Sequence, residues 1–424
     1  MWSKSSFFDR ALFLLIAFLL AWMFQIHMRL THVDYNTFHR AGLSFLQGNW
    51  SSLYSPERSS MGGFLYPLGA ASFFALFSWI GEFHGRVGFY LILAFALWGS
   101  MLWCVKRWPK TRQPLRPIWI TLLLASRSIN DSWISGNLSL LLLGLALVAL
   151  AQDGIELHDP ARSPTIRPAI RKHLSAGALA LAISFKIFPA LLGAFWIWKR
   201  DWRQVLRITA WTLVFYFAPY VCLGIFQGSF ALAGDLFQKW LFALKDPANF
   251  GSAEMIHFQN LSAALHGWSS RLGVSSRIVP VILALLTALL AFLPTLRRSS
   301  SGSSSETLSA ASESTSALAT KAAILLAWVP LLTPVTWHHL GVFYLPLLYA
   351  TACQALDPHA TPSEQRQASV SLWAFFLFYT LTGRNVWGVE RHAWISLHRI
   401  PLIGILALVL PSTLKLLRKS PPCL

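Results

Sequence analysis

The sequence predicts an all-α polytopic membrane protein. Of its 424 residues, 55% are hydrophobic and only 12% are charged, about half the charged share of a typical soluble protein. The mean hydropathy is +0.51. Apolar runs long enough to cross a bilayer recur from one end of the chain to the other. We therefore expect about 10–12 transmembrane helices, with juxtamembrane helices on the outer face.

The apolar segments that predict helices are, in chain order, 11–28, 64–80, 87–105, 117–126, 138–151, 174–198, 208–227, 277–296, 319–333, 340–356, 370–382 and 399–414. No small-residue cleavage site follows the first of them, so we interpret it as an uncleaved first span rather than a signal peptide. The four cysteines are widely scattered and predict neither a disulfide framework nor a metal cage.

The net charge of +18 comes from short basic clusters beside the apolar runs. This pattern indicates binding to anionic lipids and anchoring on the cytoplasmic side. Nucleic-acid binding is not favoured, because the chain has no soluble domain to carry it. We expect a multi-pass protein of the cell membrane. Placing the clusters and both termini in the cytoplasm predicts that 64–80 is a juxtamembrane helix on the outer side. It also predicts that 174–198 enters the membrane and returns, with two short helices meeting at Lys186–Pro189.

A Ser-rich stretch separates two parts of the chain. We expect 1–296 to form an N-terminal catalytic transmembrane module, 297–318 a flexible cytosolic linker and 319–424 a group of C-terminal transmembrane helices. The polar stretches are too short for a nucleotide-binding domain, and no phosphate-binding glycine loop is present. ATP-driven transport is therefore not expected, and we predict no cofactor and no metal site.

Asp34, in the first outer loop, is the strongest candidate for catalysis. The chain has only 17 acidic residues and no D-x-D pair, so a general base would be a single carboxylate. A helix with an apolar stripe follows it and could lie in the membrane interface, the stripe being Phe38, Ala41, Gly42, Phe45 and Leu46. On residue types alone, Asp34 or Asn36 could simply cap this helix, and the carboxylate could do both.

Several other polar residues lie on the predicted outer side or at a helix break. Lys186 could bind an anion or could snorkel to the surface. The histidines of "LLTPVTWHH" could donate a hydrogen bond to a phosphate or belong to an interfacial aromatic belt. "GNLSLLLLGLALVAL" and "HFQNLSAAL" each begin a helix with small polar groups. The outward cations are interpreted first as surface charges, and they are Arg40, Arg58, Arg127 and Arg384.

The order of these motifs along the chain is informative. An acid after the first span is followed by "FLYPLGA", "GNLSLLLLGLAL", "FKIFP", "FQNLSAAL" and "TPVTWHHLGVFYLPLL". This order resembles the GT-C glycosyltransferases of family 87, the polyprenyl-phosphate-mannose-dependent α-mannosyltransferase group, over residues of about 30 to 350. The resemblance implies a GT-C-type fold, a polyprenyl-phosphate sugar donor, and a glycolipid or glycan acceptor. It also implies an active site on the outer (periplasmic or extracellular) face.

The resemblance also implies roles for individual residues. Asp34 matches the family's catalytic base. The donor phosphate would bind to cationic or hydrogen-bonding side chains, for which we predict Lys186, His338, His339 and Arg40. Substrate binding is predicted for Tyr66, Asn137, Gln259, Asn260 and Trp337. The chain departs from the family pattern at the histidines, because His338 follows Trp337 directly, so either His338 or His339 could be the functional one.

The sequence leaves rival functions open. A lipid-linked-sugar flippase or transporter would also use an intramembrane lysine and broken helices. Its polar groups would gather at the midplane of two repeated halves, whereas this chain has no internal repeat and gathers them on one face. An oligosaccharide polymerase or ligase would share the outer-face chemistry. We favour the hexosyltransferase, with inversion at the transferred sugar, which is expected to be mannose.

Overall fold

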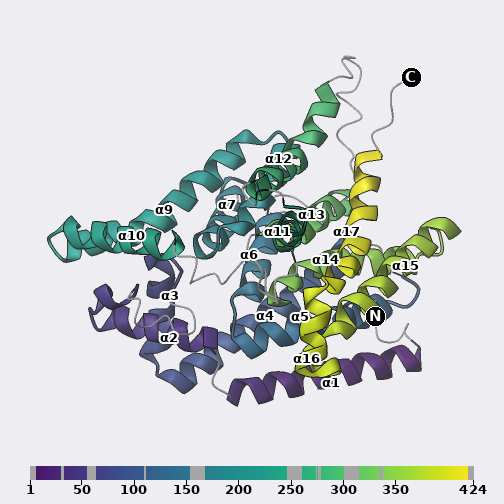
Figure 1. The fold of residues 1–424 in the computed structure, drawn as a ribbon, viewed down its shortest axis with the longest axis horizontal. Helices are drawn as coiled ribbons and strands as arrows, with labels where there is room; N and C mark the ends of the chain where they lie inside the picture. The colour runs from purple at the N-terminus through teal and green to yellow at the C-terminus, as the bar shows by residue number, and fades with distance from the viewer. Residues whose placement is uncertain are drawn as a thin grey trace.

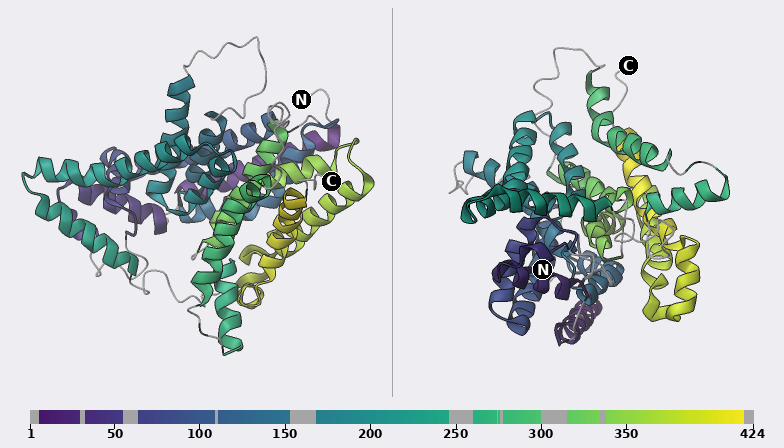
Figure 2. Two further views of the ribbon diagram at one scale, coloured as in Figure 1. Left: turned by 90° about the horizontal axis from the view of Figure 1, so that it is seen from above. Right: turned by 60° about the vertical axis from the view of Figure 1, so that its left-hand side comes forward.

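The computed structural model describes residues 6–29, 33–54, 64–108, 111–152, 168–245, 260–273, 275, 278–299, 315–333 and 338–418. Within these ranges every regular element is an α-helix or a 3-10 helix, as predicted (Figure 1). Figure 2 shows the helices from two further sides and shows that they do not form one regular bundle.

Up to residue 226, the described residues form nine α-helices and two 3-10 helices: α1 (Phe7–Arg29), α2 (Val33–Leu46), η2 (Trp50–Ser52), α3 (Leu68–Trp79), α4 (Glu82–Arg107), α5 (Arg116–Ser135), α6 (Ser139–Gln152), α7 (Pro168–Phe185), η4 (Phe188–Gly193), α8 (Ala194–Trp198) and α9 (Trp202–Phe226).

The remaining elements are α10 (Phe230–Lys245), α11 (Leu261–Arg271), α12 (Ile278–Ser299), α13 (Thr315–Leu332), η7 (His338–Tyr344), α14 (Leu345–Ala355), α15 (Pro362–Phe378), η8 (Thr380–Thr382), α16 (Arg384–Leu397) and α17 (Ile400–Arg418).

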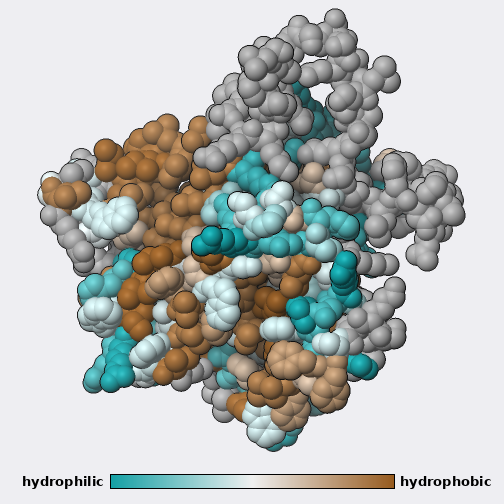
Figure 3. All heavy atoms as spheres, turned by 90° about the vertical axis from the view of Figure 1, so that its right-hand side faces the viewer, coloured by the Kyte–Doolittle hydropathy of each residue, from teal (hydrophilic) through white to brown (hydrophobic). Residues whose placement is uncertain are grey.

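Three of the described helices, α1, α4 and α9, are long and apolar enough to cross a membrane. Two bent pairs, α5 with α6 and the end of α16 with α17, would raise the number to five if each were one span. Large apolar side chains stay exposed, among them Phe18 and Trp22 on α1 and Trp373 on α15. Figure 3 shows broad apolar areas of this kind on one face of the molecule. These features fit a multi-pass membrane protein, while the expected total of 10–12 spans remains a prediction.

Helix α1 runs alongside α5 in a fixed register. At one end the Asp9 carboxylate accepts hydrogen bonds from the Arg116 guanidinium at 2.9 and 3.2 Å and from the Trp119 indole at 3.0 Å. At the other end His27 Nε2 and Asn130 Oδ1 are 3.1 Å apart. The first contact joins the N-terminal turns of the two helices, and the second joins their C-terminal halves. The two helices therefore run parallel.

The apolar stripe on α2 packs against α3. The rings of Phe38 and Phe74 stack with centroids 4.2 Å apart. A Cβ atom added at Gly42 would lie 2.7 Å from the backbone of Phe74, so a glycine is needed where the two helices meet. Phe38 and Ala41 are buried in this contact, so much of the stripe that was expected in the membrane interface belongs to the protein core. Helix α3 has 12 residues, too few to cross a hydrocarbon core of about 30 Å.

The predicted break in segment 174–198 is confirmed. Helix α7 ends at Phe185, residues 186 and 187 are not helical, and the chain continues as η4 and then α8. Pro189 stands in the first turn of η4, where the missing backbone N–H costs no hydrogen bond. Lys186 is therefore held at the junction between α7 and η4. The first of these helices is not short, because α7 has 18 residues. The expected entry into the membrane and return stays a prediction.

The structure narrows the expected linker. Helix α12 continues to Ser299 and α13 begins at Thr315, so both ends of the stretch 297–318 are helical, and 300–314 lie outside the described residues. The C-terminal helices pack directly on the N-terminal ones, with η7 and α14 against α5 and α13 against η4. The division into an N-terminal and a C-terminal module remains a prediction about folding units.

Candidate active site

Four of the predicted site residues meet where α2, α5, α6 and the α7–η4 break come together. These are Asp34, Tyr66, Asn137 and Lys186. Asp34 stands in the first turn of α2, after Val33, so it is inside the helix and is not its N-cap. Among the described residues its carboxylate accepts a hydrogen bond from Asn137 Nδ2 at 2.7 Å. The carboxylate is thus directed across to another element, which a local capping role would not require.

A left-handed glycine brings these elements together. Gly136 ends α5 with φ of 65°, a conformation that favours glycine. A Cβ atom on this residue would also lie 2.9 Å from the Tyr35 Cβ, next to Asp34. Gly136 therefore does two things: it turns the chain from α5 into α6, and it leaves room for the start of α2. Helices α5 and α6 meet here at an angle of 117°.

Asn137 connects the acid with the lysine. Its Oδ1 accepts hydrogen bonds from the Ser139 backbone N–H at 3.1 Å and from Ser139 Oγ at 2.8 Å. Because a backbone N–H can only donate, these contacts fix the oxygen of the amide, and the nitrogen must face Asp34. Lys186 Nζ also donates to Oδ1, at 3.5 Å. The amide therefore holds a carboxylate on one side and an ammonium on the other.

Aromatic rings enclose the ammonium of Lys186. Its Nζ lies 5.5 Å from the centre of the Tyr66 ring and 5.9 Å from that of Phe188, distances at which a cation is attracted to a ring face. Tyr66 packs edge-on against Phe38 of α2, with centroids 5.1 Å apart. The stripe that anchors α2 thus also positions the tyrosine over the lysine.

The surroundings of Asp34 favour its neutral form. Burial raises the pKa of Asp34 above its ordinary value, while the Asn137 hydrogen bond and the Lys186 charge act in the opposite direction. A carboxylate with a raised pKa is a better proton acceptor near neutral pH than an exposed aspartate. The site can therefore accept a proton and, at Lys186, stabilise a negative charge.

The structure separates the two histidines. His338 Nε2 lies 2.8 Å from the Nη2 atom of Arg127, and because an arginine only donates, Nε2 is the acceptor. His339 is buried, and its Nε2 has no hydrogen-bond partner among the described residues. Burial and the charge of Lys186 lower the pKa of His339, so its ring is neutral at neutral pH. A neutral imidazole can donate one hydrogen bond to a ligand but supplies no charge.

The other predicted site residues have different placements. Arg40 is on α2, exposed, and among the described residues it joins none of the contacts around Asp34. Asn260 is buried at the start of α11, where Oδ1 accepts from the Ala263 N–H at 2.7 Å and Nδ2 donates to the Thr333 carbonyl at 2.6 Å. These bonds join α11 to α13. Gln259 and Trp337 lie outside the described residues.

Sequence reasoning was wrong about Arg127. It was expected to be a surface charge in a loop, but α5 continues to Ser135 and buries it. Its Nη1 donates to the Tyr379 carbonyl at 2.7 Å and to Thr382 Oγ1 at 2.8 Å. Burial is possible because these acceptors, and the Tyr379 ring 5.2 Å from its guanidinium carbon, replace water. A charged residue directly after an apolar run carried no signal for this partner, which is about 250 residues away in the chain.

Comparison with known proteins identifies the family. The model of glycosyltransferase family 87 matches residues 64–327, well over half of the chain. The chain belongs to glycosyltransferase family 87, and it is a glycosyltransferase. This confirms the family predicted from the ordered motifs. The described residues confirm the expected all-α fold.

Two individual proteins show more distant similarity. The polyprenol-phosphate-mannose-dependent alpha-(1-2)-phosphatidylinositol mannoside mannosyltransferase of Mycolicibacterium smegmatis is 24% identical over an alignment of 346 positions, and the match covers 76% of this chain and 70% of that protein. The crystal structure of ArnT from Cupriavidus metallidurans bound to undecaprenyl phosphate matches 95% of this chain and 77% of its own, with 14% identity and a TM-score of 0.41.

Proposed function

We propose that this enzyme transfers a hexose, mannose in the first instance, from a polyprenyl-phosphate sugar to a hydroxyl of a glycolipid or glycan on the outer face of the cell membrane. The observation that carries the proposal is the carboxylate, amide and ammonium of Asp34, Asn137 and Lys186 in one hydrogen-bonded row. The donor named for the curated relative, polyprenol-phosphate mannose, supports the choice of sugar.

In the proposed reaction the acceptor hydroxyl attacks the anomeric carbon from the side opposite the phosphate. Asp34 accepts the hydroxyl proton as the new carbon–oxygen bond forms. The bond from the anomeric carbon to the phosphate oxygen breaks, and polyprenyl phosphate leaves with the electron pair, so the configuration inverts. Phosphate is a good leaving group, and no general acid is required.

Lys186 and His339 are the groups that we assign to the leaving phosphate. Lys186 supplies a positive charge in a partly dehydrated site, where charge stabilisation is strongest. His339 supplies one hydrogen bond through Nε2, which is buried and has no partner among the described residues. His338 is assigned a supporting position, because its own Nε2 is bonded to Arg127. Arg40, which is exposed, is no longer assigned to the phosphate.

The deciding experiment uses purified enzyme, radiolabelled polyprenyl-phosphate mannose and a panel of glycolipid acceptors. We expect labelled mannose to appear in a glycolipid, with the anomeric configuration opposite to that of the donor when the product is examined by NMR. A product that retains the donor configuration would contradict the single displacement at Asp34. The flippase alternative makes a different prediction: in proteoliposomes the labelled donor would change leaflet without being consumed.

A further inference from the structure

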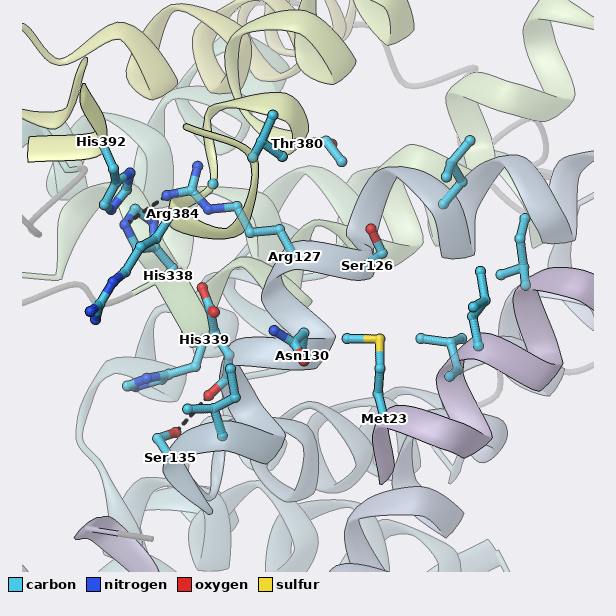
Figure 4. A pocket seen from close by; sticks show the side chains of 18 residues that line it. Met23, Ser126, Arg127, Asn130, Ser135, His338, His339, Thr380, Arg384 and His392 are labelled. Atoms are coloured by element: carbon cyan, nitrogen blue, oxygen red, sulfur yellow. Dashed lines mark hydrogen bonds between the residues drawn. The ribbon is translucent and has the colours of Figure 1, made fainter. Parts of the chain in front are cut away.

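A second polar region lies beside the proposed catalytic residues, in a cavity of about 550 Å³ between α1, α5, η7 and α16. This volume is within the range of about 300–1,000 Å³ that is usual for small-molecule sites. One wall is apolar and comes largely from a single face of α1, with Ile16, Leu19, Leu20 and Met23 at helical spacing. Figure 4 shows Met23 on one side of the cavity and Asn130 opposite it.

The opposite wall, on α5, offers hydrogen-bonding groups that the protein does not use. Among the described residues, no hydrogen bond or ion pair reaches the Asp131 carboxylate, which lines the cavity. Asn130 Oδ1 forms a hydrogen bond with His27 Nε2, and Asn130 Nδ2 has no hydrogen-bond partner among the described residues. Ser135 Oγ is one turn further on and donates to the Asp131 carbonyl at 2.8 Å. The wall thus presents a strong acceptor next to an amide donor.

The cation nearest in sequence on α5 does not neutralise this carboxylate by direct contact. Arg127 is one helical turn before Asp131, and its guanidinium is held by Tyr379, Thr382 and His338. The charge of Arg127 stabilises this half-buried carboxylate, yet the hydrogen bonds of Arg127 are made elsewhere. Asp131 is therefore an ionisable group whose hydrogen bonds remain for something that enters the cavity.

Resting on the proposed function, we propose that this cavity binds the sugar ring of a neutral glycolipid acceptor, with Asp131 accepting hydrogen bonds from its hydroxyls. Sugar hydroxyls donate to a carboxylate and accept from an amide, which are the two groups that Asp131 and Asn130 present. A phosphate beside Asp131 would meet a like charge. The apolar face of α1 suits the alkyl chain of such a lipid.

The cavity also adjoins the turn between α5 and α6. Ser135 and His339 belong to its wall, and Gly136 and Asn137 follow Ser135 directly in the chain. Asn137 holds Asp34, and His339 is within electrostatic reach of Lys186. The wall that would hold the sugar ring therefore continues, through Ser135 and Gly136, into the turn that carries the hydrogen-bond partner of Asp34. Arg384 and His392, at the α16 side, are the groups that a rival anionic headgroup would use.

Binding can be tested apart from catalysis with radiolabelled n-octyl α-D-mannopyranoside and enzyme in lipid nanodiscs, by equilibrium dialysis against empty nanodiscs. We expect Asp131→Asn, which keeps the side-chain volume, to weaken binding about tenfold or more, because the hydroxyls lose a charged acceptor. Met23→Trp fills the cavity from the opposite wall and should abolish binding, so the result does not depend on one variant. Asp235→Asn removes an exposed carboxylate on α10 and should bind as the parent does.

Unchanged binding in Asp131→Asn or Met23→Trp would overturn the proposal, and so would displacement of the glycoside by an equal concentration of sodium n-octyl phosphate, which would indicate an anion site. Asp34→Asn should bind the glycoside normally. If Asp34→Asn retained full transferase activity while Asp131→Asn still lost binding, the assignment of the base would fail and the acceptor cavity would stand.

Discussion

Two polar regions lie at the same end of α5, and they use charge in opposite ways. Around Asp34, the charged groups are joined by an amide whose orientation is fixed by a backbone N–H, and the acid and the ammonium both remain available to a ligand. Around Arg127, the guanidinium is bonded to a backbone carbonyl, a hydroxyl and an imidazole. The first arrangement suits chemistry, and the second joins the C-terminal helices to α5.

The largest effect on activity is expected at Asp34. Replacing Asp34 with Asn should reduce kcat/KM by about 10²–10⁴-fold, because the proton acceptor is lost. Folding should be preserved, since the neutral amide no longer has to bury a charge where burial disfavours it. Transfer from labelled donor gives the rate, and the thermal midpoint gives stability. A variant with full activity would show that Asp34 is not the base.

Arg127 should behave in the opposite way. Arg127→Met leaves the Tyr379 carbonyl, Thr382 Oγ1 and His338 Nε2 without their guanidinium donor, which should cost about 1–3 kcal/mol of folding free energy. The readout is a lower thermal midpoint in detergent. Arg384→Met is the matched control, because Arg384 is an exposed cation at the same cavity and should change stability by no more than about 0.5 kcal/mol. Equal thermal midpoints for the two variants would show that Arg127 has no structural role.

The same two regions show what sequence patterns can predict. Asp34 was visible because the chain has few acidic residues and this one follows the first apolar segment. Lys186 was visible because a charge among apolar residues is rare, and the proline after it indicated the helix break. Tyr66 and Asn137 could be found only through the order of the family's motifs. In each case the signal was local, or was carried by a motif of a few residues.

Arg127 and Asp131 could not be found in this way. The apolar run 117–126 stops just before Arg127, so hydropathy predicts a loop where α5 continues for two more turns to Ser135. Arg127 on those turns is bonded to Tyr379, Thr382 and His338, which are more than 200 residues away in the chain. Helix α10 was missed for a related reason: it lies between the predicted segments 208–227 and 277–296, and because it is amphipathic it has no continuous apolar run.

Lys186 is the second residue around Asp34 whose loss should lower the rate. Lys186→Met should lower kcat/KM by about 10²–10³-fold, the usual effect of removing one group that stabilises charge in a transition state. Lys186→Arg keeps the charge and should recover part of the rate. The control is Arg40→Met, a cation lost from the exposed side of α2, which should remain within about twofold of the parent in the same assay. A loss at Arg40 equal to that at Lys186 would point to general surface charge instead of the site.

Replacing Asn137 should have the smallest effect, a shift in the pH at which kcat/KM falls on the acid side. The acid limb of kcat/KM reports the pKa of the free base, and for Asp34 it should lie above the ordinary aspartate value of about 3.9. The Asn137 hydrogen bond stabilises the carboxylate and so lowers this pKa. Asn137→Ala removes the bond, and activity should then be lost at a higher pH than in the parent.

Ser139→Ala provides the graded control for this shift. It removes one hydroxyl bond to Asn137 Oδ1 but leaves the Ser139 backbone N–H, which alone fixes the amide orientation. The acid limb should therefore move little. If the limb of Asn137→Ala stayed in place or moved to lower pH, Asn137 would not be the partner that sets the proton affinity of the base. Asp34 would then have to be held by groups other than the amide at the turn between α5 and α6.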